Sequence, residues 1–154
     1  MRDKLHMPRA ILASMMGTAV LALASVASAA QPQIPTPTIS QASRADIKAA
    51  QEALTAKRYT EAVAKSNAVL ASSGKTKDDA FAAYSFLFMA AQAQGDKAGM
   101  MKALEGQIET GFLPPGAQSL QYRNLLGMAY QQKDYRKAIE YGQQLIIWRI
   151  ESAA

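Results

Sequence analysis

The side chains that could carry out acid–base chemistry are few, and their spacing is poor for it. Glu105 and Glu109 are one helical turn apart, a spacing at which two carboxylates can share a proton. Exposed charge is the usual state of glutamate, so we interpret this pair as part of a solvated helix face. Asp78 and Asp79 are adjacent and better suited to the start of a helix. Neither pair predicts a catalytic site.

A second candidate is Gly74-Lys75-Thr76, which looks like the end of a phosphate-binding loop. The complete motif needs another glycine five residues before Gly74, and that position holds Val69. No strand is expected before it either. We therefore do not predict nucleotide binding.

Residues 1–29 have the layout of a secretory signal peptide. A basic start and the apolar run of residues 10–24 precede Ala27-Ser28-Ala29, which has the A-x-A pattern of a cleavage site. The alternative is an uncleaved membrane anchor, but the run is shorter than the roughly 20 residues of a spanning helix. We expect cleavage after Ala29, with no membrane attachment afterwards. This predicts a periplasmic or secreted protein whose mature chain begins at Ala30.

Removing the signal peptide changes the chemistry that the chain can perform. The only histidine, His6, lies within it, and the chain has no cysteine. A mature chain without either residue excludes thiol catalysis, a Ser-His-Asp triad, ordinary zinc sites and disulfides. The whole chain has 17 basic and 12 acidic residues, and losing three basic and one acidic residue leaves about +3. So mild an excess does not indicate nucleic-acid binding. We expect no enzymatic activity, no metal and no cofactor.

A proline-rich linker is predicted over residues 30–42. Pro32, Pro35 and Pro37 favour an extended, polyproline-like conformation. We interpret it as a spacer, with a proline-rich recognition motif as the alternative. The folded domain is then expected over residues 43–150, followed by a tail of residues 151–154.

Equivalent residues recur every 38 positions in the folded part. Because a single helical hairpin cannot bury its own apolar face, a fixed period of this size predicts stacked hairpins. Apolar residues recur at helical spacing in six segments, and none alternates as a strand would. The recurring sets are Tyr59, Lys97 and Tyr135; Ala62, Met100 and Ala138; and Leu70, Ile108 and Ile146.

The last of these hairpins resembles the tetratricopeptide repeat family. Leu126-Gly127-Met128-Ala129-Tyr130 matches that family's L-G-x2-Y pattern, and Ala138 supplies the small residue of the second helix. The middle hairpin departs from it, with Phe88 in place of glycine and Met100 in place of alanine. The resemblance implies an all-α, right-handed stack of about three hairpins. It also places Gly127 and Ala138 where two helices nearly touch.

The resemblance further implies a concave groove lined by the first helix of each hairpin. Such a groove would be neutral and rich in amides, which suits an extended peptide because amides can bond its backbone. Phe86 and Met89 point away from the apolar face of their helix and are the best apolar candidates for a ligand contact. The groove residues expected in this way are Lys48, Glu52, Ser85, Met89, Gln92, Asn124, Met128 and Gln131.

The C-terminal edge is a second candidate interface. Leu145 and Ile146 can face inward, but Ile147, Trp148 and Ile150 cannot all do so. A repeat stack needs a polar cap at its end, so these three residues predict either a chain truncated relative to its relatives or contact with a partner or a second copy in a homodimer. The main expectation is a protein-interaction adaptor, with a self-associating structural protein as the alternative. A small-ligand carrier or an all-α enzyme is the less favoured reading.

Overall fold

The computed structural model describes residues 33–151, which form six α-helices and no strand. The expected all-α fold is therefore confirmed for this range. The chain divides into two compact units, Met1–Ala30 and Gln31–Ala154, and the described residues all belong to the second. The expected signal peptide and its cleavage site lie outside the described residues. The helices are α1 (Arg44–Thr55), α2 (Tyr59–Ala71), α3 (Lys77–Gln94), α4 (Lys97–Glu109), α5 (Pro115–Gln131) and α6 (Tyr135–Glu151).

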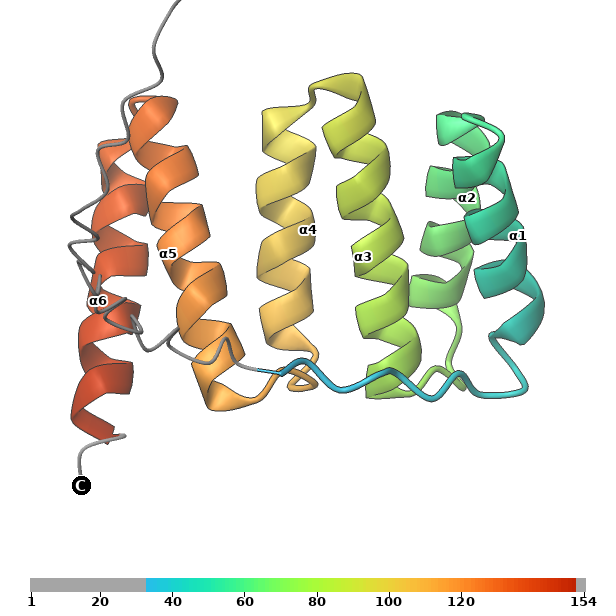
Figure 1. Ribbon diagram of the computed structural model, residues 1–154, viewed down its shortest axis with the longest axis horizontal. Helices are drawn as coiled ribbons and strands as arrows, with labels where there is room; N and C mark the ends of the chain where they lie inside the picture. The colour runs from blue at the N-terminus through green and yellow to red at the C-terminus, as the bar shows by residue number, and fades with distance from the viewer. Residues whose placement is uncertain (1–32, 152–154) are drawn as a thin grey trace, which may run out of the picture. The chain divides into compact units, whose positions relative to one another are not determined.

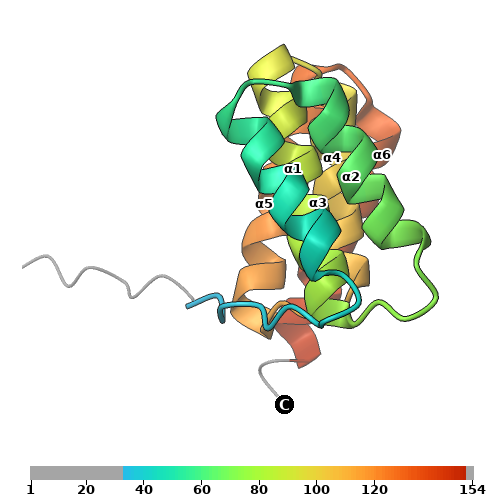
Figure 2. The same ribbon diagram turned by 90° about the vertical axis from the view of Figure 1, so that its right-hand side faces the viewer.

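Successive helices run in opposite directions and form three hairpins, α1 with α2, α3 with α4, and α5 with α6 (Figure 1). The hairpins stack because α2 packs against α3 and α4 packs against α5. Seen from the α1 end, α1, α3 and α5 lie to one side and α2, α4 and α6 to the other (Figure 2). None of these helices is long and apolar enough to cross a membrane, as far as residues 33–151 are concerned.

The turn within each hairpin has the same backbone geometry. Lys57, Gly95 and Lys133 all have positive φ angles, of 58°, 69° and 61°. The next residue in each turn donates its N–H to a carbonyl five residues earlier, which closes the helix end with the bond of a Schellman motif. These bonds run from Arg58 to Ala53, from Asp96 to Ala91 and from Asp134 to Ala129, at 2.7, 2.9 and 2.9 Å. The 38-residue period of the sequence is therefore a period of the backbone as well.

Two apolar clusters hold neighbouring hairpins together. One joins the first hairpin to α3, and the other joins the middle hairpin to the last. The first contains Ile47, Val69, Ala82 and Ala83, with Ile39, Leu70 and Phe86 packed against it. The second contains Met101, Leu104, Leu125, Ala129 and Tyr141, with Ala138 among the residues packed against it.

Gly106, in the middle hairpin, lies tightly against the neighbouring helix. A Cβ atom there would overlap the ring of Tyr84, whereas a Cβ at Gly127 would meet nothing within 4 Å. The expectation that Gly127 lies in a tight helix contact is therefore wrong. Phe86 was also expected to point away from the core, yet it packs against the first cluster.

The third hairpin is displaced relative to a regular stack. The backbones of α1 and α3 approach each other closely, but those of α3 and α5 stay more than 8 Å apart between Cα atoms. The loop before α5 fills the space between their lower ends. Its Phe112 stacks on Phe81 of α3 with ring centres 4.4 Å apart, and its Leu113 is buried against Ala117 of α5. We infer that these two loop side chains hold α5 away from α3.

Helix α5 begins at Pro115, with Pro114 preceding it. Proline is favoured in this first position because it lacks the N–H that would have no partner there, and its φ angle is already helical.

The described part of the proline-rich segment is attached to the helices. The backbone N–H of Thr38 donates to Asp78, and that of Ser40 donates to Asp79, both at 2.8 Å. Ile39 packs against the first apolar cluster. The segment runs along the lower ends of the helices before α1 begins (Figure 1). Residues 38–42 therefore belong to the folded unit and are not a free spacer.

Candidate functional site

A groove of about 660 Å³ opens between α3 and α5, where a regular stack would bring these helices together. Helix α4 forms its floor, with Leu104 and Gln107, because the backbones of α3 and α5 are held apart. The groove exists in this form because Phe112 and Leu113 separate the two helices below it. Its lining comes from α3, α4 and α5, with one residue, Ile34, from the N-terminal segment.

A row of hydrogen-bonded side chains crosses this groove from α5 to α3. Asn124 donates to the Gln121 carbonyl oxygen at 3.5 Å, and Gln121 donates to that of Gln107 at 3.1 Å. Gln107 then donates to the Ser85 hydroxyl at 3.4 Å, and Ser85 donates to the Phe81 backbone carbonyl at 2.9 Å. All four bonds run in the same direction. The row fixes the orientation of each amide.

Burial is greatest at Gln107 and falls from there outward to Asn124. Gln107 is only 5% exposed, which is rare for an amide and is possible because both ends of its side chain are bonded. Gln121 is partly buried and Asn124 is exposed. The exposed end therefore presents an amide held in place by a satisfied interior network, and a fixed amide is suited to bonding an extended backbone.

The apolar part of the groove lies beside this row. Phe81 and Leu104 are buried beneath the surface, while Phe88 and Met128 are partly buried and remain accessible from the groove. An apolar surface with a few oriented polar groups is the usual make-up of a binding site. Arg123 is the one charged residue in the lining, so the groove is close to neutral.

The structure brings together four of the eight residues expected in the groove. Ser85, Asn124, Met128 and Gln131 all line it. Met89 and Gln92 lie on α3 and are exposed, but they are not part of the lining.

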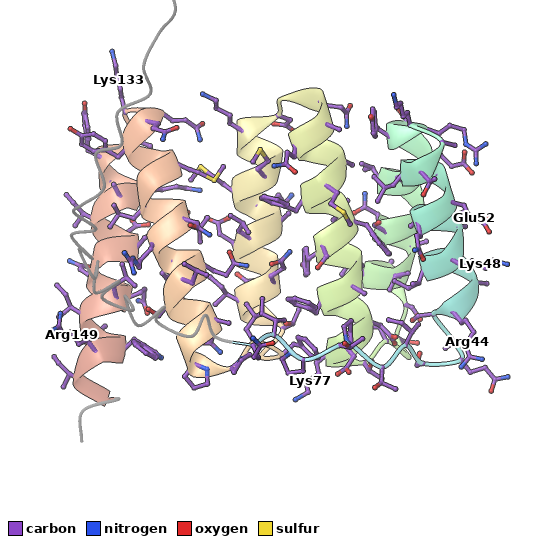
Figure 3. All side chains as sticks on the ribbon, viewed as in Figure 1. Arg44, Lys48, Glu52, Lys77, Lys133 and Arg149 are labelled. Atoms are coloured by element: carbon purple, nitrogen blue, oxygen red, sulfur yellow. The ribbon has the colours of Figure 1, made fainter. Side chains whose placement is uncertain are left out.

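The other two expected residues, Lys48 and Glu52, belong to a different surface. They pair with each other at 3.7 Å. Figure 3 shows both on the outer side of α1, pointing away from the other hairpins. An exposed pair of this kind contributes little free energy. The groove is therefore confined to the middle and last hairpins.

Sequence reasoning missed the residues that organise the groove. Gln107 lies between Leu104 and Ile108 on the apolar side of α4, and a polar residue in such a place was the available signal. Gln121 is one turn before Asn124, on the same side of α5. No sequence pattern indicated Ile34 as a groove residue, because its position depends on how residues 38–40 attach to α3.

At the lower end of α3, Asp79 is the point that attaches the N-terminal segment. It is fully buried, and its carboxylate accepts the backbone N–H of Ser40 and, at 2.9 Å, that of Thr76. Thr76 caps α3 in return, accepting the Asp79 N–H at 3.1 Å. Burial alone would raise the pKa of Asp79, but the hydrogen bonds from Thr76 and Ser40 outweigh it and lower the pKa to about 2.

Glu105 is more than a solvated surface residue, which corrects the expectation from the sequence. It accepts hydrogen bonds from the Tyr141 hydroxyl and, at 3.3 Å, from Lys137, so it joins α4 to α6. Burial, reinforced by the bond to Glu105, raises the pKa of Tyr141. Glu109 is exposed and takes no part in these bonds. These bonds tie the last hairpin to the middle one. That structural role explains both hydrogen bonds that the Glu105 carboxylate accepts.

The outer face of α6 is the second candidate surface. Its exposed residues lie at helical spacing along one side of the helix, which we call the α6 stripe. The stripe differs from the edge expected from the sequence, because Ile146 is 62% exposed instead of facing inward and Trp148 is partly buried. Ile147 is 48% exposed but lies to one side of it. The α6 stripe consists of Tyr135, Ile139, Ile146 and Ile150, which are 56%, 62%, 62% and 67% exposed.

Comparison with known proteins identifies no relative. No family description, no curated protein and no solved structure matches the chain. Within residues 33–151, no three or more acidic, histidine or cysteine side chains converge to hold a metal ion. The groove and the α6 stripe are therefore the features that bear on function.

Proposed function

We propose that the chain is an interaction protein that binds an extended peptide in the groove between α3 and α5. The observation that carries this proposal is the row from Ser85 through Gln107 to Asn124, because it presents oriented amides beside an apolar surface. An extended peptide needs both features, since its backbone requires hydrogen-bond partners and its side chains require apolar contacts. The near-neutral lining favours a peptide without a strong charge.

The proposal includes the resemblance to tetratricopeptide repeats and an exported location. The three turns repeated at 38 residues support a hairpin-repeat architecture. The basic start, apolar run and Ala27-Ser28-Ala29 site support export to the periplasm or beyond. The partner is then a protein or peptide met outside the cytoplasm.

A selection from a library of displayed extended peptides tests the proposal. Selected peptides should lose about tenfold or more in affinity for Asn124→Arg, since the change removes an amide and adds bulk and charge at the groove. Gln92→Arg is the matched control, because Gln92 is equally exposed on α3 but lies outside the groove. Circular dichroism would verify that both variants fold. Peptides that bind both variants as tightly as the wild type would rule out this groove.

A second candidate function is self-association, supported by the α6 stripe. Three isoleucines that are each more than half exposed on one helix face form an unusually apolar surface. A patch on one helix that is complementary to itself would produce a twofold dimer. The two functions do not conflict, because the groove lies between α3 and α5 and the stripe lies on the outer face of α6.

A further inference from the structure

The chain places one of its own side chains in the groove. Ile34 lines it together with Ser85 of α3 and Asn124 of α5. Pro35 and Pro37 follow, and both residues keep the backbone of this segment extended. The groove therefore already holds one aliphatic side chain, that of Ile34, and this residue is followed directly by a proline.

The attachment of this stretch lies further along the chain. Thr38 and Ser40 are bonded to Asp78 and Asp79, and Ile39 is packed in the core. Ile34 itself is 45% exposed. Four residues of extended chain span at most about 14 Å, so the anchored residues keep Ile34 near the groove even when its side chain is out of it.

We propose that the segment of residues 33–37 is an internal competitor, which places Ile34 in the groove where the partner peptide would bind. The partner would be an extended peptide in which an aliphatic residue precedes a proline, and it would bind by displacing Ile34 from the groove. This inference rests on the proposed function, since it assigns a class of sequence to the peptide that the groove accepts.

The chemistry of the groove fits such a sequence. Phe88 and Met128 offer an apolar surface to the aliphatic side chain. A proline-rich backbone has more carbonyl acceptors than N–H donors, because proline has no N–H. Asn124, Gln121 and Gln131 carry amide N–H₂ groups that can donate to those carbonyls. A peptide held by such donors needs no charge of its own.

The internal segment should weaken the binding of an external peptide by competition. A short tether gives the attached group an effective concentration in the millimolar range. If a free peptide of the same sequence has a dissociation constant of about 0.1 mM, occupancy by Ile34 would make that constant about tenfold larger. Removing the Ile34 side chain should restore the tighter binding.

The experiment uses the full chain and a fluorescent peptide with the sequence of residues 31–37. Anisotropy should show binding about tenfold tighter to Ile34→Ser than to the wild type. Ile34→Ser should fold normally, since Ile34 is nearly half exposed, and its thermal midpoint would verify this. A peptide carrying Ile34→Asp is the matched control and should bind neither protein. Equal affinity for wild type and Ile34→Ser, or no binding to either, would overturn the inference.

A crosslink that holds residue 34 in the groove tests the same competition, because it prevents the segment from being displaced. The chain has no cysteine, so Ile34→Cys can be joined selectively by a short thiol crosslinker to Arg123→Cys, a position that lines the groove but is not part of the hydrogen-bonded row. Crosslinking should abolish peptide binding, and a cleavable linker should restore it on reduction. Undiminished binding after complete crosslinking would contradict the displacement.

Failure of this inference can be separated from failure of the proposed function. One outcome is that peptides selected from the library depend on Asn124 and yet bind wild type and Ile34→Ser equally. That result would retain the groove as a peptide site and overturn the role of residues 33–37. If no selected peptide depends on Asn124, both proposals fall together.

Discussion

The ring of Tyr84 lies directly against the backbone of Gly106, so close that a methyl group on Gly106 would overlap it. This contact joins α3 to α4 within the middle hairpin. It also shows why a glycine is required within a helix, where its conformational freedom would otherwise be a disadvantage.

Gly106→Ala should therefore destabilise the fold, by about 1–3 kcal/mol from overpacking. Gly127→Ala is the matched control, because a Cβ at Gly127 has open space around it. That substitution should be neutral or stabilise by up to about 1 kcal/mol, since alanine favours a helix more than glycine does. Denaturant unfolding of both variants measures the difference. Equal effects of the two changes would show that the Tyr84 contact is misplaced.

At the turns within the hairpins, introducing glycine is expected to stabilise the fold. Lys57 and Lys133 hold a left-handed conformation that costs about 1 kcal/mol for a residue with a side chain, whereas Gly95 adopts it at no such cost. Lys133→Gly and Lys57→Gly should each raise the thermal midpoint. Gly95→Ala should lower it by a similar amount. A fall in the midpoint for both lysine variants would mean that their side chains contribute more than the turn geometry costs.

Stability at low pH should depend on Asp79. Its pKa is lowered to about 2 in the folded chain, against an ordinary value of 3.8, so its ionised form favours folding. The contribution is complete above about pH 4 and is lost as the pH falls towards 2. The size of the shift corresponds to roughly 2 kcal/mol.

Asp79→Asn should remove about that much stability at pH 7 and flatten its dependence on pH between 4 and 2. Asp78→Asn is the control, because Asp78 makes an exposed bond to Thr38 only and should change stability by less. Thermal melts across this pH range would measure both. An unchanged slope in Asp79→Asn would place the acid sensitivity elsewhere in the chain.

The helices and turns could be predicted from the sequence because local signals specify them. The recurrence of Tyr59, Lys97 and Tyr135 marks the start of each hairpin's second helix, and all three begin helices in the structure. These features depend on residues close together in the chain, and no long-range packing is needed to choose among them.

The groove could be predicted only in part because its width depends on distant contacts. A regular repeat would bring α3 against α5, and the packing of Phe112 and Leu113 prevents this. The sequence showed that the loop was long but not where its side chains would lie. The same limit explains Gly127, since a glycine in a matching motif does not reveal whether another helix comes near.

The α6 stripe gives the last prediction. Burying one isoleucine side chain contributes about 1.5–3 kcal/mol, so a twofold pairing of α6 that covers Ile139 and Ile146 on both copies would bury four. After the entropy of association is subtracted, a measurable dimer is still expected. Ile139→Lys with Ile146→Lys should weaken it by more than about 100-fold, which corresponds to only about 3 kcal/mol. Leu120→Lys is the matched control, because Leu120 is 41% exposed but lies on α5. Sedimentation velocity over a range of concentrations would measure the change, and a wild type that stays monomeric throughout would show that the stripe does not pair with itself.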